Sequence, residues 1–159
     1  MKSFLIGTLG FLFMSPFNIA GDSMEPLLAH NDTAMFESLT YMLEEPQRGD
    51  VVVFYGTDES DKIFVKRIIG LPGETLWLRE EKVFIIDSEG NEMQLEESYL
   101  NDDTQEYSLR QMDGTRYKVP QGKYFVLGDN RRSSFDSRTW HDPFVPKENL
   151  VGKYYYTLF

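Results

Sequence analysis

A serine that could act as a nucleophile stands in the stretch Gly21-Asp22-Ser23-Met24-Glu25-Pro26. This stretch directly follows the only long apolar run of the sequence. If that run lies in a membrane, Ser23 would stand beside the membrane surface and face a molecule that crosses it. A serine hydroxyl becomes an effective nucleophile once a neighbouring base takes its proton. Gly-Asp-Ser is also ordinary turn chemistry, so these residues by themselves fit either a plain turn or a catalytic serine.

The base for Ser23 must come from elsewhere in the chain, and histidine most often serves as one. Of the two histidines, His30 is too near Ser23 in sequence to face it from an opposing strand, and His141 stands in a turn-like, aromatic setting typical of a surface residue. Lys66 is the better candidate. Its neighbours between Phe64 and Ile69 are mostly apolar, and a strand through them would carry the ammonium group into a dry environment.

Lysine acts as a general base near neutral pH only when its pKa falls from about 10.4 towards 8. Desolvation can supply a shift of that size, which corresponds to about 3 kcal/mol. The other interpretation of Lys66 is a solvated side chain at the edge of a strand. The residues around Lys66 leave both interpretations open.

Two further stretches accompany the serine stretch, FVKRIIGLPGE at residues 64–74 and GDNRRSSFDSR at residues 128–138. In this order and spacing, the three stretches resemble the bacterial type I signal peptidases, membrane-bound serine/lysine proteases that cut signal peptides from exported proteins. The resemblance extends from about Phe17 to Gly152. It implies an all-β catalytic domain of the signal-peptidase type, a folded β-sheet or barrel, that works without metal or cofactor.

The resemblance also assigns roles to individual residues. Ser23 matches the nucleophile, Lys66 the general base, and Ser134 the serine that hydrogen-bonds the lysine and orients it. Gly21 stands where some members have a serine whose hydroxyl helps to hold the oxyanion, so here the backbone N–H of Ser23 would carry that task. The residues that match the family's structural charges near the site are Asp129, Arg131, Asp136 and Arg138.

Shallow pockets for the substrate residues before the cut are implied by the same resemblance. The pocket for the −1 residue is lined by Ile19, Met24, Leu28, Phe64 and Val65, and the pocket for the −3 residue by Phe17, Ile19 and Val65. These side chains are bulky and apolar, so small residues are expected at −1 and −3. The sequence departs from the family pattern at Leu27, Arg132 and Ser133.

Composition narrows the possible partners. The net charge of −10 argues against nucleic acid, because binding of phosphates needs a clustered basic surface. The absence of cysteine excludes disulfides and thiolate metal sites, and two histidines make a histidine zinc site improbable. The resemblance implies signal peptides of exported preproteins as partners, and the apolar N-terminal run predicts a lipid bilayer as another.

Residues 1–20 are expected to form an N-terminal membrane anchor. Ser3 to Ala20 is apolar, but at about 18 residues it is at the short limit for a span, and a cleaved signal peptide or a buried helix are alternatives. Lys2 before this run and acidic residues after it predict a single pass in the cytoplasmic membrane, with residues 21–159 on the extracytoplasmic side.

Beyond the anchor the sequence predicts β structure. Apolar and β-branched runs separated by turn signals indicate strands at 33–38, 51–55, 63–69, 76–78, 83–86, 123–127 and 150–159. Residues 87–122 form an irregular acidic insertion, whose charged side chains are expected to lie on a solvated surface. The pattern therefore favours an all-β barrel or folded sheet.

The sequence thus predicts a signal peptidase with a serine/lysine dyad that acts through an acyl-enzyme intermediate. One alternative is a serine/lysine autoprotease of the SOS-repressor type, although that architecture has a DNA-binding helical domain where this chain has an apolar segment. Another alternative is a catalytically inactive, membrane-tethered β domain that only binds peptides. The presence of both Ser23 and Lys66 in their motifs argues against inactivity.

Overall fold

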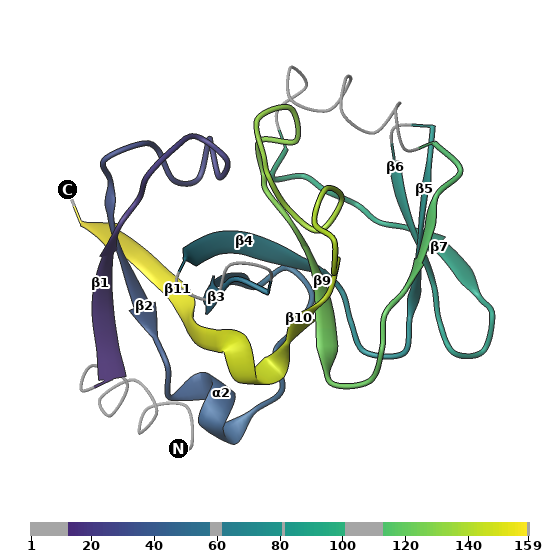
Figure 1. The fold of residues 1–159 in the computed structure, drawn as a ribbon, viewed down its shortest axis with the longest axis horizontal. Coiled ribbons are helices and arrows are strands. Elements are labelled where there is room, and N and C mark those ends of the chain that lie inside the picture. Colours follow the sequence, from purple (N-terminus) through teal and green to yellow (C-terminus); the bar gives the residue numbers. More distant parts are fainter. Residues whose placement is uncertain (1–12, 58–61, 81, 101–112, 159) are drawn as a thin grey trace.

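The computed structural model describes residues 13–57, 62–80, 82–100 and 113–158. These residues are mostly β structure, and they form two sheets that lie side by side (Figure 1). The helical elements of the described chain are short: α2 (Thr40–Leu43) and a 3₁₀ turn at Lys147–Asn149. The predicted all-β fold is confirmed at this level.

The larger sheet has seven strands in the order β1-β2-β11-β3-β4-β9-β10. Their bounds are Met14–Asn18 for β1, Thr33–Glu37 for β2, Leu150–Leu158 for β11, Val51–Tyr55 for β3, Ile63–Gly70 for β4, Lys123–Leu127 for β9 and Val145–Pro146 for β10. Every neighbouring pair is antiparallel. The centre is formed by β3, a run of β-branched and aromatic residues that is buried from Val51 to Phe54.

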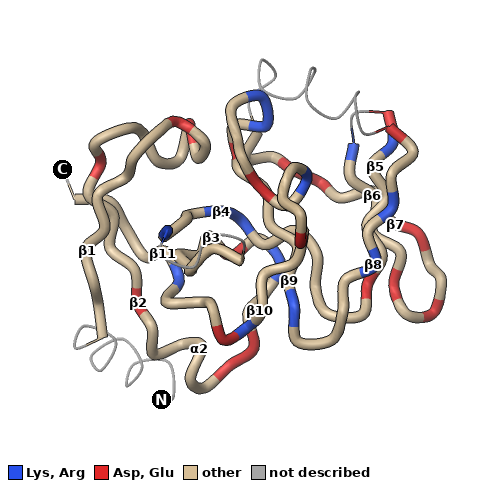
Figure 2. The backbone as a smooth tube through the Cα atoms, in the orientation of Figure 1, with Lys and Arg blue, Asp and Glu red and all other residues tan. Residues whose placement is uncertain are grey.

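The smaller sheet has four strands in the order β7-β6-β5-β8. These strands are β7 (Glu92–Gln94), β6 (Lys82–Ile86), β5 (Thr75–Arg79) and β8 (Arg116–Lys118). Figure 2 shows acidic residues in the turn between β6 and β7. The chain enters this sheet at Gly70, where a Cβ atom would lie 2.4 Å from Leu76 Cδ1, so only glycine fits the passage.

Strand positions agree closely with the alternation and β-branching of the sequence. The predicted strands at 51–55 and 123–127 have the observed bounds, and the others differ by a residue at one or both ends. The sequence analysis missed β1, β7, β8 and β10. The last three have only two or three residues each, which is too short to show a periodic pattern.

The N-terminal prediction is only partly within the described residues. Residues 1–12 lie outside them, so the anchor stays a prediction there. Met14–Asn18, which the predicted range 1–20 included, is strand β1, and it pairs with β2 so that Phe17 lies opposite Ala34. No helix in the described part of the chain is long and apolar enough to span a membrane.

Three apolar clusters form the core, and one of them joins the two sheets. One lies between the smaller sheet and β9, and the other two lie on opposite sides of β3. The cluster that includes Val51 and Val53 also contains Ile19, Met24 and Leu28. The core therefore reaches into the turn that carries Ser23.

Candidate active site

Ser23 lies in the loop between β1 and β2, and the two ends of that loop are fastened together. Ile19 N donates to Asp32 O at 2.8 Å, and Asn31 N donates to Ile19 O at 2.9 Å. Below Ser23, the side chains of Met24 and Leu28 are 1% and 0% exposed. The loop is therefore anchored at its base and from beneath, which limits the movement of the hydroxyl group.

The third sequence motif contacts this loop directly. Asn130 N donates to Ser23 O at 3.0 Å. A Cβ atom at Gly128 would lie 2.5 Å from the same oxygen and 2.2 Å from Ser134 Oγ. Gly128 therefore allows the chain before Asn130 to pass against the backbone of Ser23.

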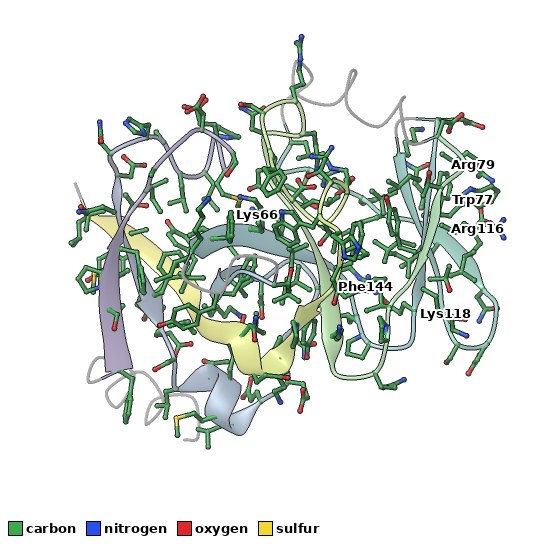
Figure 3. All side chains as sticks on the ribbon, in the orientation of Figure 1. Lys66, Trp77, Arg79, Arg116, Lys118 and Phe144 are labelled. Carbon is green, nitrogen blue, oxygen red and sulfur yellow. The ribbon has the colours of Figure 1, made fainter. Side chains whose placement is uncertain are left out.

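Lys66 projects from β4 toward the Ser23 loop (Figure 3). Its Nζ lies 2.8 Å from Ser23 Oγ and 2.8 Å from Val65 O. Only 4% of Lys66 is exposed. The structure therefore brings together two residues that are 43 positions apart in sequence, at hydrogen-bonding distance and away from bulk water.

Burial lowers the pKa of Lys66 from 10.5 to about 8. The carboxylates of Asp136 and Asp129 act in the opposite direction, and the guanidinium of Arg138 lowers the pKa further. The atoms bonded to Nζ are uncharged oxygens, so they do not hold the ammonium form as a carboxylate would. Close to pH 8 about half of the Lys66 side chains would be neutral and able to accept a proton.

Ser134, predicted to orient the lysine, lies close to the dyad but does not bond to it. Its Oγ is buried and makes no hydrogen bond of good geometry among the described residues, although it lies near enough to Asp136 to help lower the pKa of that carboxyl. The hydrogen bonds of Lys66 Nζ go to Ser23 and Val65 instead. The orienting role of Ser134 therefore stays a prediction.

Four buried ionic residues that the sequence placed near the site take part in ion pairs behind it. Both carboxylate oxygens of Asp129 accept hydrogen bonds from the guanidinium of Arg67, whose Nε lies 2.8 Å from Oδ1. Asp136 and Arg138 form a bidentate pair as well: Nε donates to Oδ1 at 2.8 Å, and Nη2 donates to Oδ2 at 2.7 Å. Burial alone would raise the pKa of Asp136, but the bonds and charge of Arg138 hold it below its usual value.

Arg131 pairs with a residue that the sequence analysis misplaced. Its guanidinium is 0% exposed and binds both carboxylate oxygens of Glu97, whose side chain is 7% exposed. Glu97 belongs to the acidic insertion that was expected to be a solvated surface, so that expectation is wrong for this residue. Tyr99 also turns inward, donating its hydroxyl to Glu97 at 2.6 Å and lying under Arg67 at 4.0 Å.

Arg67 is the other residue of this network that the sequence analysis missed, although a signal was present. It follows Lys66 on the same strand, and successive side chains of a strand point to opposite faces. A cation carried into the core on that face needs a carboxylate partner. Asp129 supplies it.

A cavity of about 310 Å³ opens beside the dyad. It is lined by Phe17, Asn18, Ile19, Ala20, Ser23, Met24, Ile63, Phe64, Val65 and Lys66. Of the predicted pocket residues, Leu28 alone is not in this lining; it is fully buried and packs in the core behind Met24 and Ile19. Within the described part of the chain, no group of three His, Cys, Asp or Glu side chains could hold a metal ion.

Two strand edges border this cavity. In the described sheet β1 pairs on one side only, with β2. Strand β4 pairs with β3 along Ile63 to Arg67, whereas its pairing with β9 begins at Arg67. On the side of the cavity, no strand of the described residues pairs with the backbone from Ile63 to Lys66.

The sequence profile described as signal peptidase, peptidase S26, matches residues 2–159. The chain belongs to this family. It is 39% identical over 141 residues to a probable signal peptidase I-2 of Synechocystis sp., a match that covers 85% of this chain and 58% of the relative. It is 36% identical over 142 residues to the signal peptidase I of Leptolyngbya laminosa, covering 85% and 64%. The chain thus spans less than two thirds of the length of these two relatives.

Other comparisons cover more of the related protein. The chain is 35% identical over 159 residues to signal peptidase I U of Bacillus subtilis, covering 95% of this chain and 82% of that one. The crystal structure of a signal peptidase I from Enterococcus faecalis superposes with a TM-score of 0.54 at 32% identity, covering 69% of this chain and 97% of that one.

Proposed function

We propose that this protein is a signal peptidase I, a serine endopeptidase that removes signal peptides from exported preproteins. The observation that carries the proposal is the contact of 2.8 Å between Lys66 Nζ and Ser23 Oγ, in surroundings that bring the pKa of the lysine to about 8. Membership of the signal peptidase family supports it independently.

In the proposed reaction, neutral Lys66 takes the proton of Ser23 as the hydroxyl oxygen attacks the carbonyl carbon of the scissile peptide bond. The tetrahedral intermediate carries its negative charge on the former carbonyl oxygen. Ser23 N–H is the proposed donor to that oxygen, because it makes no hydrogen bond among the described residues. The lysine then gives its proton to the leaving amine, and an acyl-enzyme on Ser23 remains.

Hydrolysis of the acyl-enzyme reverses these roles. Lys66, neutral again after protonating the amine, takes a proton from water as the water attacks the ester carbon. Ser23 leaves with that proton, and the signal peptide departs with a free carboxylate. Ser134, whose buried hydroxyl makes no hydrogen bond of good geometry in the described chain, is proposed to bond the lysine and to hold its lone pair toward Ser23 when substrate is bound.

The substrate is proposed to bind as an added strand between the two open edges at β1 and β4. Main-chain hydrogen bonds to an edge give affinity with little demand on sequence. Alternate side chains of a strand point the same way, so the −1 and −3 residues would face the cavity and the −2 residue would not. The apolar lining of Phe17, Ile19, Met24, Phe64 and Val65 supports a preference for small residues at −1 and −3.

A series of preproteins with leucine at −1, −2 or −3 tests this binding mode. We expect leucine at −1 or −3 to prevent efficient cleavage and leucine at −2 to be accepted. Efficient cleavage with leucine at −1 would contradict it.

The N-terminal segment is proposed to anchor the protein in the cytoplasmic membrane, with the β domain on the extracytoplasmic side. Because β1 begins at Met14, the anchoring part would precede that residue. Protease added to spheroplasts should then digest the β domain and spare the N-terminus. A wholly soluble distribution in the cytosol would instead favour the repressor-type autoprotease.

The decisive test is incubation of the detergent-solubilised protein with a preprotein, followed by sequencing of the new N-terminus. We expect a single cleavage site with small residues at both −1 and −3. Ser23→Ala should remove the activity and leave the fold intact. Cleavage by Ser23→Ala would contradict the mechanism, and binding of signal peptides without any cleavage would support an inactive peptide-binding domain.

A further inference from the structure

Gly21, two residues before the proposed nucleophile, is held by a histidine that the proposed reaction does not use. Gly21 N donates to His30 Nδ1 at 2.9 Å. Gly21 has a φ of +91°, and a Cβ atom built on it would have nothing within 4 Å. The backbone at Gly21 is therefore not held by packing around it.

This hydrogen bond restrains the part of the Ser23 loop that is otherwise least fixed. The base of the loop is fastened at Ile19, and Ser23 O is fastened by Asn130. Between them, glycine can adopt both signs of φ with little cost. Rotation at Gly21 would turn the following peptide groups, including the one that carries Ser23 N–H.

We propose that His30 is a positioning residue for the oxyanion-binding backbone, an inference that rests on the proposed function. Nδ1 accepts a hydrogen bond, so the imidazole must be neutral with its proton on Nε2. In this form it fixes Gly21 and thereby aims Ser23 N–H at the developing oxyanion. Removal of the Nδ1 acceptor would release this restraint.

The hydrogen bond of the His30 side chain is the one to Gly21, and no hydrogen bond or ion pair joins His30 to another element in the described residues. The neighbouring Asp32 is engaged by Ala29 N, which donates to its Oδ2 at 2.8 Å. The imidazole is therefore available to hold Gly21.

Three variants separate this role from a general structural one. In His30→Asn, the side-chain Oδ1 can occupy the position of Nδ1 and accept the same bond, but it does not titrate. His30→Leu removes the acceptor. His141→Asn is the matched control, because it changes the other histidine of the chain.

The measurement is kcat and KM of the full-length, detergent-solubilised protein on a preprotein at pH 8.5. We expect His30→Asn to match the wild type, and His30→Leu to lower kcat about three- to tenfold at unchanged KM, as for one lost hydrogen bond. His141→Asn should follow the wild type.

The amide resonance of Gly21 supplies a readout that does not depend on turnover. In ¹⁵N NMR spectra it should keep its wild-type position in His30→Asn and move in His30→Leu, which has no acceptor. If no preprotein is cleaved by the wild type but the resonance moves only in His30→Leu, the proposed function fails and the restraint stands. A His30→Leu variant with wild-type kcat, or a His30→Asn variant as slow as His30→Leu, would overturn the inference.

Discussion

Lys66 and Arg67 are consecutive cations of β4, and their side chains enter two different regions of the molecule. Lys66 enters the cavity beside Ser23, where it bonds only to uncharged oxygens. Arg67 enters the buried ion-pair network, where it meets the carboxylate of Asp129. The strand alternates its side chains between two faces, so a single step along the chain separates the two regions.

The difference between these regions lies in how each compensates a buried charge. A cation without a carboxylate partner is destabilised by desolvation, and the pKa of Lys66 falls to about 8. A guanidinium bound by a carboxylate keeps its charge, and its burial is compensated by two hydrogen bonds. The first arrangement produces a base, whereas the second produces a rigid support. The comparison predicts that the two regions respond differently to the same kind of substitution.

Exchange of the two cation types should give the largest effect. Lys66→Arg places a group that is not deprotonated in proteins where a base is needed, so kcat/KM on a preprotein should fall at least about 1,000-fold. Arg67→Lys keeps a charge that can still reach Asp129, and it should cost less than about tenfold. Urea unfolding would show whether each variant is folded, and substantial activity of Lys66→Arg would disprove the assignment of the base.

Breaking an ion pair in the network should act on stability. Arg131→Met leaves the buried carboxylate of Glu97 without a cation, with only the Tyr99 hydroxyl as a partner, and should lower the free energy of unfolding by about 3–5 kcal/mol, measured by urea unfolding. The control is Lys147→Met, which breaks a pair with Glu45 whose side chains are 37% and 70% exposed, so water screens the pair and its loss should change the free energy of unfolding far less. Adding Glu97→Gln to Arg131→Met should recover part of the loss. Equal effects of the two single substitutions would contradict the distinction between the regions.

Removing the charge of Lys66 should raise the free energy of unfolding at neutral pH, in contrast to removing the charge of Arg131. Wild-type folding must desolvate the ammonium group, which costs about 3 kcal/mol at any pH below about 8 for a pKa lowered from 10.5 to about 8. As pH rises from 8 toward 10.5 the unfolded chain binds more protons than the folded one, so wild-type stability increases and the cost disappears. The stability of Lys66→Met relative to the wild type should therefore decrease by about 3 kcal/mol between pH 7 and pH 11. A difference independent of pH would mean that the lysine is not desolvated.

The smallest of these effects is expected at Ser134, which lies between the two regions. Ser134→Ala removes the predicted orienting hydroxyl and should slow cleavage by about 10- to 100-fold. Because Oγ makes no hydrogen bond of good geometry among the described residues, the loss of the hydroxyl should change the midpoint of urea unfolding little. If Ser134→Ala kept wild-type turnover but had reduced stability, Ser134 would belong to the buried ion-pair network and not to the candidate active site.

The sequence contained enough to predict the main strands and, through its resemblance to the signal peptidases, a candidate dyad. The composition of a run such as Val51 to Tyr55 is enough to predict a strand, because β-branched and aromatic residues favour strands. Ser23 and Lys66 each stand in a motif whose neighbours already indicate a turn or a dry strand. These are local properties, and a local pattern can be read without knowledge of the fold.

Other features could be decided only by the tertiary structure. Met14–Asn18 is apolar enough to resemble part of an anchor, yet it is a strand because β2, distant in sequence, offers it an antiparallel partner. Glu97 has the surroundings of a surface residue in the sequence, and only the approach of Arg131 places it in the core. In both cases the deciding partner lies far along the chain.

The same reasoning applies to the chemistry of the candidate site. The sequence by itself supplied a lysine with apolar neighbours. The depth of its burial, the distance of 2.8 Å to Ser23 and the bond between Gly21 and His30 depend on how β4, β9 and the Ser23 loop pack. Desolvation and hydrogen bonding act over a few ångströms in space, so the residue types fix which reactions are possible and the packing of distant segments decides the pKa and the geometry.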